Sequence, residues 1–192
     1  INGTRSEIAD FLKDRPGFKQ PKNIQQVRDI VEAVQLLCDE GDFRAAHFLS
    51  QTKLSKGGYE YNIFRDLPAI NEGLECDLAF VGDKYRQQKV ANIFDEMLVA
   101  YYCSGVSLAH YFLGNLEVAL EWRFKSIEIN KKKKRPIDPI DLHEVSLIEI
   151  TMGNLKKARK TISKAFYYST KYNDLLKTEV IYNIKTYFEY LL

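Results

Sequence analysis

The chain has 192 residues, enough for one domain with a sizeable core, and its 45% hydrophobic and 28% charged residues are ordinary for a soluble globular protein. No apolar run approaches the roughly 18 residues that a bilayer-spanning helix needs, and the first residues lack the basic start and apolar stretch of a secretory signal. The 3 cysteines are widely spaced and form no C-x-x-C pair, which fits a reducing compartment. These features predict an intracellular, cytoplasmic protein with no membrane span.

The net charge of +2 hides an uneven distribution along the chain. Residues 39–121 hold 13 acidic against 7 basic side chains, whereas residues 123–171 hold 13 basic against 5 acidic ones. An acidic middle is therefore followed by a basic segment, and this asymmetry predicts that the basic charge gathers on part of the surface.

Helical periodicity dominates the sequence. Between residues 24 and 38, apolar side chains recur at steps of three and four, which predicts a helix with one apolar face. Gly41 stands where a helix C-terminus favours glycine, and the same period resumes directly after it, so a helical hairpin with a very short turn is expected. The same form recurs around Gly114 and Gly153 and, more weakly, around Gly82.

The six-residue sequence Gly-Asn-Leu-x-x-Ala occurs twice, at 114–119 and at 153–158, which is a separation of 39 residues. Glycine permits the positive φ that ends a helix, asparagine is a residue whose side chain caps the next helix, and a small alanine lets two helices cross closely. We therefore interpret the repeated sequence as a turn and not as a binding motif. The four glycine turns are 41, 32 and 39 residues apart, a spacing typical of stacked helical hairpins.

These patterns predict an all-α protein made of antiparallel helical hairpins, in a single domain over residues 1–192. In chain order, we expect an N-terminal arm at 1–23, a first hairpin at 24–52, a connecting segment at 53–73, further hairpins at 74–171 and a closing helix at 172–192. The charged, proline-containing stretch 130–141 is expected to be a loop within the hairpin region.

The segments "GNLEVALEWRFKSIEI" and "GNLKKARKTISKAF" resemble the turn and second helix of tetratricopeptide repeats (TPRs), and "EGDFRAAHFLSQ" fits almost as well. The likeness covers residues 24–52 and 95–171. The chain departs from the family pattern at Arg123, where an aromatic residue is usual, and in its unequal repeat lengths. The resemblance to a degenerate TPR array implies a right-handed α-solenoid whose first helices line a concave, peptide-binding surface.

Alignment of this resemblance on Gly114 and Gly153 implies which residues line that surface. They are mostly apolar or aromatic: Tyr101, Ser104, Leu108, Tyr111, Ile140, His143, Leu147 and Ile150. Such a lining fits a partner helix or hydrophobic segment laid into a groove. It does not fit the TPRs that hold a C-terminal carboxylate with Lys, Asn and Arg. We expect roughly half of this set to be core.

No arrangement of catalytic residues stands out in the sequence. His47, His110 and His143 are far apart, and there is no phosphate-binding glycine loop, nucleophile elbow or metal-ligand spacing. Cys38 and Cys103 lie in apolar helical runs, where cysteine packs as a small hydrophobe. We therefore expect no enzymatic activity, no cofactor and no metal site.

The run "KKKKRP" at 131–136 is the sharpest local feature of the basic segment. A candidate basic patch combines it with lysines of the next hairpin: Lys131, Lys132, Lys133, Lys134, Arg135, Lys156, Lys157 and Lys160. Such a patch suits RNA, an acidic peptide or an anionic membrane, and the run itself is also typical of a nuclear localisation signal. A solvated loop between two hairpins is the simpler explanation of the run.

The sequence thus favours a non-catalytic scaffold that binds a protein or peptide segment in an apolar and aromatic groove. One alternative is a helical repeat domain of a larger enzyme, such as a transferase, or of a peptide-sensing regulator. The chain begins at Ile1 and stops at Leu192 without a polar tail, which favours that alternative. A second alternative is nucleic-acid binding through the basic segment 123–171, and assembly into a homo-oligomer also stays open.

Overall fold

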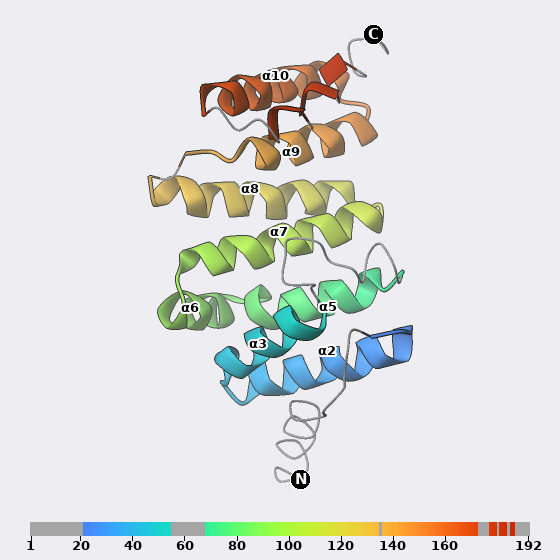
Figure 1. Cartoon of the computed structure of the whole chain (residues 1–192), viewed down its shortest axis with the longest axis vertical. Coiled ribbons are helices and arrows are strands. Elements are labelled where there is room, and N and C mark those ends of the chain that lie inside the picture. The colour runs from blue at the N-terminus through green and yellow to red at the C-terminus, as the bar shows by residue number, and fades with distance from the viewer. Residues whose placement is uncertain are drawn as a thin grey trace.

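The computed structural model describes residues 21–54, 68–134, 136–172, 177–179, 181–183 and 185–186. Every regular element within these residues is a helix, and the helices pack as antiparallel pairs. The longer helices are α2 (Ile24–Asp39), α3 (Phe43–Lys53), α5 (Ile70–Val81), α6 (Lys84–Ile93), α7 (Glu96–Phe112), α8 (Leu116–Lys132), α9 (Pro139–Thr151) and α10 (Leu155–Lys171). They are layered along the long axis of the molecule, from α2 to α10 (Figure 1). The predicted all-α class with antiparallel helix pairs is confirmed.

Three of the four predicted glycine turns share one geometry. Gly41, Gly114 and Gly153 have φ of 86°, 79° and 76°, the left-handed conformation in which a helix commonly ends. Each glycine amide donates to the carbonyl three residues earlier, and the next amide donates to the carbonyl five residues earlier, at 2.8–3.1 Å. This pair of hydrogen bonds is the Schellman motif, which satisfies carbonyls that the helix end would otherwise leave free.

The alanine of the repeated sequence lies where two helices cross. Ala119 and Ala158 are fully buried, as is Ala46 at the same distance after Gly41. The hydroxyl of Ser107 on α7 donates to the backbone carbonyl of Ala119 on α8 at 2.7 Å. A side chain of one helix therefore reaches the backbone of the next, which confirms the predicted close crossing.

The asparagine of the repeated sequence does not cap the helix that follows, so that prediction is wrong. Neither Asn115 nor Asn154 accepts a hydrogen bond with its side chain from the helix it precedes. Asp42, at the same position before α3 and with nearly the same backbone as Asn115, accepts from the Ala45 amide at 3.0 Å. A carboxylate offers two acceptor oxygens and a negative charge that a helix N-terminus attracts, whereas an amide offers one neutral oxygen.

The Gly82 turn differs from the other three. Gly82 has φ of −59°, in the right-handed region, so it does not form the left-handed helix stop. Side chains of α6 bind the last carbonyls of α5 instead: Arg86 donates to the carbonyls of Leu78 and Ala79, and Gln87 donates to that of Val81. The predicted fourth glycine turn, at Gly82, is therefore a turn of another kind.

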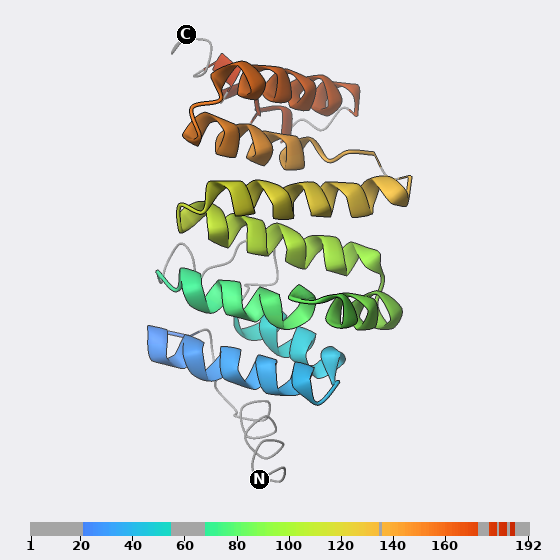
Figure 2. The same ribbon diagram turned by 180° about the vertical axis from the view of Figure 1, so that it is seen from behind.

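The Gly82 turn also changes the edge of the molecule at which the later hairpin turns lie. α6 has only 10 residues and is seen almost end-on in Figure 1, whereas α5 lies across the view. Because α6 does not run back along α5, α7 starts at the edge where α5 ended and packs against it in the opposite direction. The α2–α3 turn consequently lies at the left edge of Figure 1 and the α7–α8 and α9–α10 turns at the right edge. Figure 2 shows the same arrangement from behind.

The core of α2 to α7 is rich in aromatic side chains. Phe80 of α5 stacks on Tyr102 of α7 with ring centroids 4.0 Å apart, and Phe43 of α3 lies 6.5 Å from Phe80. The Tyr102 hydroxyl is 2.7 Å from Nδ1 of His47 on α3, so the one polar atom of this buried ring has a partner. These contacts join α3, α5 and α7 into one core.

Two predicted loops are shorter in the structure. α5 begins at Ile70, inside the predicted connecting segment 53–73, because Pro68 marks the boundary and Gly73 is buried within the helix. α8 extends to Lys132, so Lys131 and Lys132 are helical rather than part of a loop over 130–141. Basic side chains in the last turn are favoured there by the partial negative charge of a helix C-terminus.

Most of the two predicted terminal parts lies outside the described residues. This applies to the N-terminal arm up to residue 20 and to most of the closing helix at 172–192. Within the latter, Ile181 is fully buried against Ile162 and Ala165 of α10. None of the helices that the structure describes is long and apolar enough to cross a membrane.

Candidate functional site

Three of the predicted groove residues lie on or next to the C-terminal turns of α7 and α9, where the two helices touch. The hydroxyl of Thr151 on α9 is 3.4 Å from the hydroxyl of Tyr111 on α7. Leu147 is one turn before Thr151, and Leu108 is one turn before Tyr111, so each pair shares a helix face. All of these but the exposed Thr151 are half-buried. We call this set, Leu108, Tyr111, Leu147 and Thr151, the α7–α9 face.

Other predicted groove residues have their contacts elsewhere. Tyr101 lies toward α3, where its hydroxyl accepts from Gln51 Nε2 at 3.3 Å. The Ser104 hydroxyl is 2.9 Å from that of Ser126 on α8. His143 is only 8% exposed, so it falls in the part of this set that is core. Ile140 and Ile150 are half-buried on α9.

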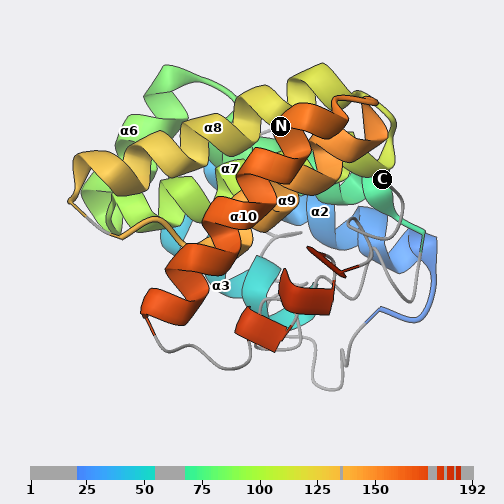
Figure 3. The ribbon, with the colours of Figure 1, turned by 90° about the horizontal axis from the view of Figure 1, so that it is seen from above.

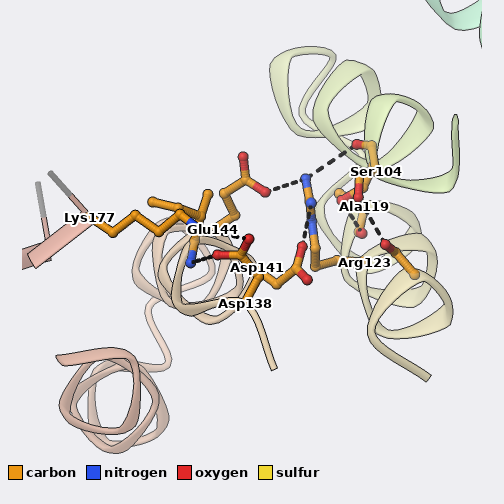
Figure 4. A network of polar contacts seen from close by, with 10 residues as sticks. Ser104, Ala119, Arg123, Asp138, Asp141, Glu144 and Lys177 are labelled. Carbon is orange, nitrogen blue, oxygen red and sulfur yellow. Dashed lines mark hydrogen bonds and ion pairs between the residues drawn. The ribbon is translucent and has the colours of Figure 1, made fainter. Parts of the chain in front are cut away.

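The start of α9, which carries His143, packs toward a charged side chain of α8. Arg123 is 3% exposed and lies between α7, α8 and α9 (Figure 4). Its Nη1 is 3.2 Å from Asp141 Oδ1, and its Nη2 is 2.5 Å from Glu144 Oε2. Nη2 also donates to the carbonyl of Ser104 at 3.2 Å. One guanidinium thus connects three helices, and we call Arg123, Asp141 and Glu144 the Arg123 cluster.

The charged contacts continue at the start of α9. Asp138 caps this helix by accepting from the Ile140 amide at 2.9 Å, and its second oxygen is 3.1 Å from Lys177 Nζ. Lys177 belongs to the segment that follows α10, as Figure 4 shows. The first turn of α9 is therefore bound on both sides, by Arg123 and by Lys177.

Burial controls protonation in the Arg123 cluster. It raises the pKa of Asp141 and of Glu144, and the positive charge of Arg123 opposes that shift without cancelling it. Burial lowers the pKa of His143, and Arg123 acts there in the same direction. Among the described residues, Arg123 Nε and both ring nitrogens of His143 have no hydrogen-bond partner. The site therefore favours a neutral His143 and relies on one guanidinium to balance two carboxylates.

In the sequence, Arg123 stands out only as a departure from an aromatic position of the family pattern. A usable signal was present, because Ala119, Arg123 and Ser126 follow one another at steps of four and three and form the buried face of α8. A cation on such a face requires buried counter-charges, and Asp141 and Glu144, three residues apart on the next helix, supply them.

The predicted basic patch is divided between two edges of the molecule. Lys131 to Lys134 lie at the end of α8 and in the turn after it, whereas Lys156, Lys157 and Lys160 lie in the first half of α10. Both helices run from the right edge of Figure 1 to the left edge, so the end of α8 and the start of α10 are on opposite sides. The two groups do not form one patch, and Arg135 lies outside the described residues.

The cysteines are part of the core. Cys38, Cys76 and Cys103 are free and buried, which confirms the interpretation of Cys38 and Cys103 as packing residues. Burial raises the pKa of Cys38 and of Cys103 to about 12, and that of Cys76 is raised for the same reason. These thiols are therefore protonated and unreactive at neutral pH. In the described part of the chain, no group of three or more side chains has an arrangement that could hold a metal ion.

Comparisons of the chain with protein-family models, with curated proteins and with solved structures find no match. The interpretation of its surfaces therefore rests on their geometry. Two surfaces stand out in this geometry, the α7–α9 face and the basic side of α10, and the Arg123 cluster lies between the two hairpins that carry them.

Proposed function

We propose that this chain is a non-catalytic interaction scaffold, a TPR-like α-solenoid that binds a segment of a partner protein across α7 and α9. The contact between Thr151 and Tyr111 supports this proposal most directly, because it brings the C-terminal turns of the first helices of two successive hairpins together. A partner segment laid across this contact would touch both hairpins at once.

The chemistry around the contact suits a partner of mixed apolar and aromatic character. Leu108, Tyr111 and Leu147 are each partly open to solvent. Phe112, at the end of α7, is 52% exposed, and its ring centroid is 5.6 Å from that of Tyr111. Partly exposed aromatic and aliphatic side chains that gather on one face are typical of protein-binding surfaces. Tyrosine adds a hydroxyl with which a bound backbone can form a hydrogen bond.

The Arg123 cluster holds α7 and α9, the two helices of this face, at a fixed distance from each other. It binds α9 to α8 through two carboxylates and to α7 through the Ser104 carbonyl. A binding surface whose two helices are already held in position loses less conformational entropy when a partner docks. We therefore infer that the cluster supports binding indirectly, without touching the partner.

The proposal is tested with a double variant, Leu108→Glu with Leu147→Glu, used as bait in affinity capture followed by mass spectrometry. Two carboxylates on the α7–α9 face are expected to abolish capture of any partner that the unchanged protein retains, because the docking segment would bury them unpaired. The matched control is Phe48→Glu, an exposed aromatic side chain on α3. Circular dichroism checks that each bait is folded. Undiminished capture by the folded double variant would contradict the proposal.

A further inference from the structure

α10 carries only positive charge. Its sequence contains six basic residues and no acidic one. All six are exposed: Lys156, Lys157, Arg159, Lys160, Lys164 and Lys171. The opposite side of the helix buries Ala158, Ile162 and Ala165 in the protein. Within the described residues, these six cations have no carboxylate within ion-pair distance, so their charge is available to a ligand.

Four of these lysines and one tyrosine form a line along the helix, which we call the lysine stripe. Lys156, Lys160, Lys164, Tyr167 and Lys171 follow at steps of four, four, three and four residues. Such steps keep side chains on one helix face, and 15 residues of helix measure about 22 Å. Tyr167 is 58% exposed, and Lys171 Nζ is 5.9 Å from the centroid of its ring.

The stripe lies at the end of the molecule where a long ligand has access. α10 is the last of the longer helices in the layered arrangement. Figure 3, which looks onto this end, shows α10 lying across α9 with its outer side toward the viewer. In the part of the chain that the structure describes, no helix lies over this outer side, so a linear polyanion can follow it.

We propose that the lysine stripe binds single-stranded nucleic acid, with its lysines on the phosphates and Tyr167 stacked on a base. Charge complementarity with a polyanion motivates the class of ligand, and an exposed aromatic ring within a row of cations is the combination that binds unpaired bases. A membrane surface is less suited, because the apolar face that an interfacial helix inserts into lipid is here buried in the core. This surface is separate from the α7–α9 face, so the two proposals can fail independently.

The first test is fluorescence anisotropy with a labelled uridine-rich RNA of about 12 nucleotides, within the range of known single-strand site sizes. If four lysines contact phosphates, the slope of log K against log salt is expected to be about −3, which makes binding about 50-fold weaker at 200 mM than at 50 mM salt. No binding at 50 mM salt would overturn the proposal.

A pair of matched triple variants locates the site. Lys156→Glu, Lys160→Glu and Lys164→Glu together are expected to abolish binding. Lys131→Glu, Lys132→Glu and Lys133→Glu make the same change in net charge at the end of α8, on the side opposite the start of α10. They are expected to alter the affinity less than about 3-fold, because α9 lies between the end of α8 and the stripe. Equal losses in both triple variants would show an effect of net charge alone and would also overturn the proposal.

A second matched pair tests stacking. Tyr167→Ala is expected to weaken RNA binding about tenfold without changing the salt slope, because a stacked base loses its platform while the phosphate contacts remain. Tyr85→Ala is the control: Tyr85 is 65% exposed on α6 and has Lys89 Nζ 5.3 Å from its ring centroid, as Tyr167 has Lys171. Binding of duplex DNA or of a glutamate-rich peptide as tight as that of the RNA would assign the stripe to another polyanion and reject the single-strand proposal.

Discussion

The core of α3, α5 and α7 and the junction of α8 with α9 are built from opposite chemistries. In the first, Phe80 stacks on Tyr102 and Phe43 packs tilted against Phe80. In the second, a buried guanidinium meets two carboxylates. In an apolar core, the loss in free energy of unfolding grows with the number of atoms that a substitution removes. In a buried ion cluster, removal of one partner leaves the other charges buried and unpaired, which costs more than removal of the whole cluster. The difference teaches that two regions of one helical protein can respond differently to substitution.

The aromatic core provides the largest expected effect. Phe80→Ala removes a fully buried ring stacked at 4.0 Å on Tyr102, and should lower the free energy of unfolding by about 3–5 kcal/mol. Urea denaturation followed by circular dichroism measures it. Phe48→Ala, on the exposed side of α3, is the control and should change stability by less than about 0.5 kcal/mol. A loss below about 1 kcal/mol for Phe80→Ala would refute the central role of this stack.

For the Arg123 cluster, replacing one charged residue should lower the free energy of unfolding more than replacing all three. Arg123→Ala leaves two carboxylates without their cation and is expected to cost about 3 kcal/mol; Glu144 keeps 27% of its side chain exposed, which limits the loss. Replacing the whole cluster, with Arg123→Met, Asp141→Leu and Glu144→Leu, should restore most of that stability. The same denaturation assay compares them. A triple variant less stable than Arg123→Ala would show that the cluster contributes a net favourable energy.

The pH dependence tests His143 by itself. Burial also lowers the pKa of His47 in the aromatic core, so only a comparison with a His143 variant isolates the contribution of His143. The pKa of His143 is lowered in the folded protein, so below its ordinary value of 6.5 the unfolded chain binds more protons, and stability is lost as the pH falls. Between pH 7.5 and 5.5 this loss is at most about 1.4 kcal/mol. The raised pKa of Asp141 and Glu144 acts in the opposite direction. His143→Leu should therefore flatten the fall in stability with acid. Identical pH profiles of the unchanged protein and this variant would exclude His143 as the titrating group.

The smallest effect is expected at the N-termini of α3 and α10, which begin at equivalent positions of two hairpins. Asp42 caps α3 with its side chain, and Asp42→Ala should cost about 1 kcal/mol. Asn154 precedes α10 without a side-chain cap, and Asn154→Ala should change stability by less than about 0.5 kcal/mol. Thermal unfolding of the two variants decides this. Equal losses would mean that Asn154 does cap its helix in solution.

Local chemistry explains which parts of the fold could be predicted from the sequence. Gly114 and Gly153 end their helices in the left-handed region, and Ala119 and Ala158 are buried at helix crossings. Both features depend on the few residues around each turn, so the sequence is enough to predict them. The direction change at Gly82 depends on Arg86 and Gln87 binding the end of α5. That contact competes with the left-handed turn, and only the tertiary structure decides between them.

The candidate sites were harder to predict than the helices. Leu108 and Leu147 could be nominated from the repeat frame, but the same frame placed His143 in the groove, because it contained no information about the cation of α8 toward which α9 packs. The predicted basic patch is divided in the structure, and the reason is geometric. Lys131 and Lys156 are near in sequence but are separated by the length of a helix.

The layered arrangement has a consequence for how the protein folds and opens. Among the described residues, the larger helix contacts all join helices close together in the chain, such as α5 with α7, α7 with α8 and α9 with α10. Chains of low contact order close only short loops and fold rapidly, typically in microseconds to milliseconds. The same locality lets one end open while the other stays folded. The α8–α9 junction, where the Arg123 cluster and the Thr151–Tyr111 contact join two hairpins, is where such a partial opening would begin.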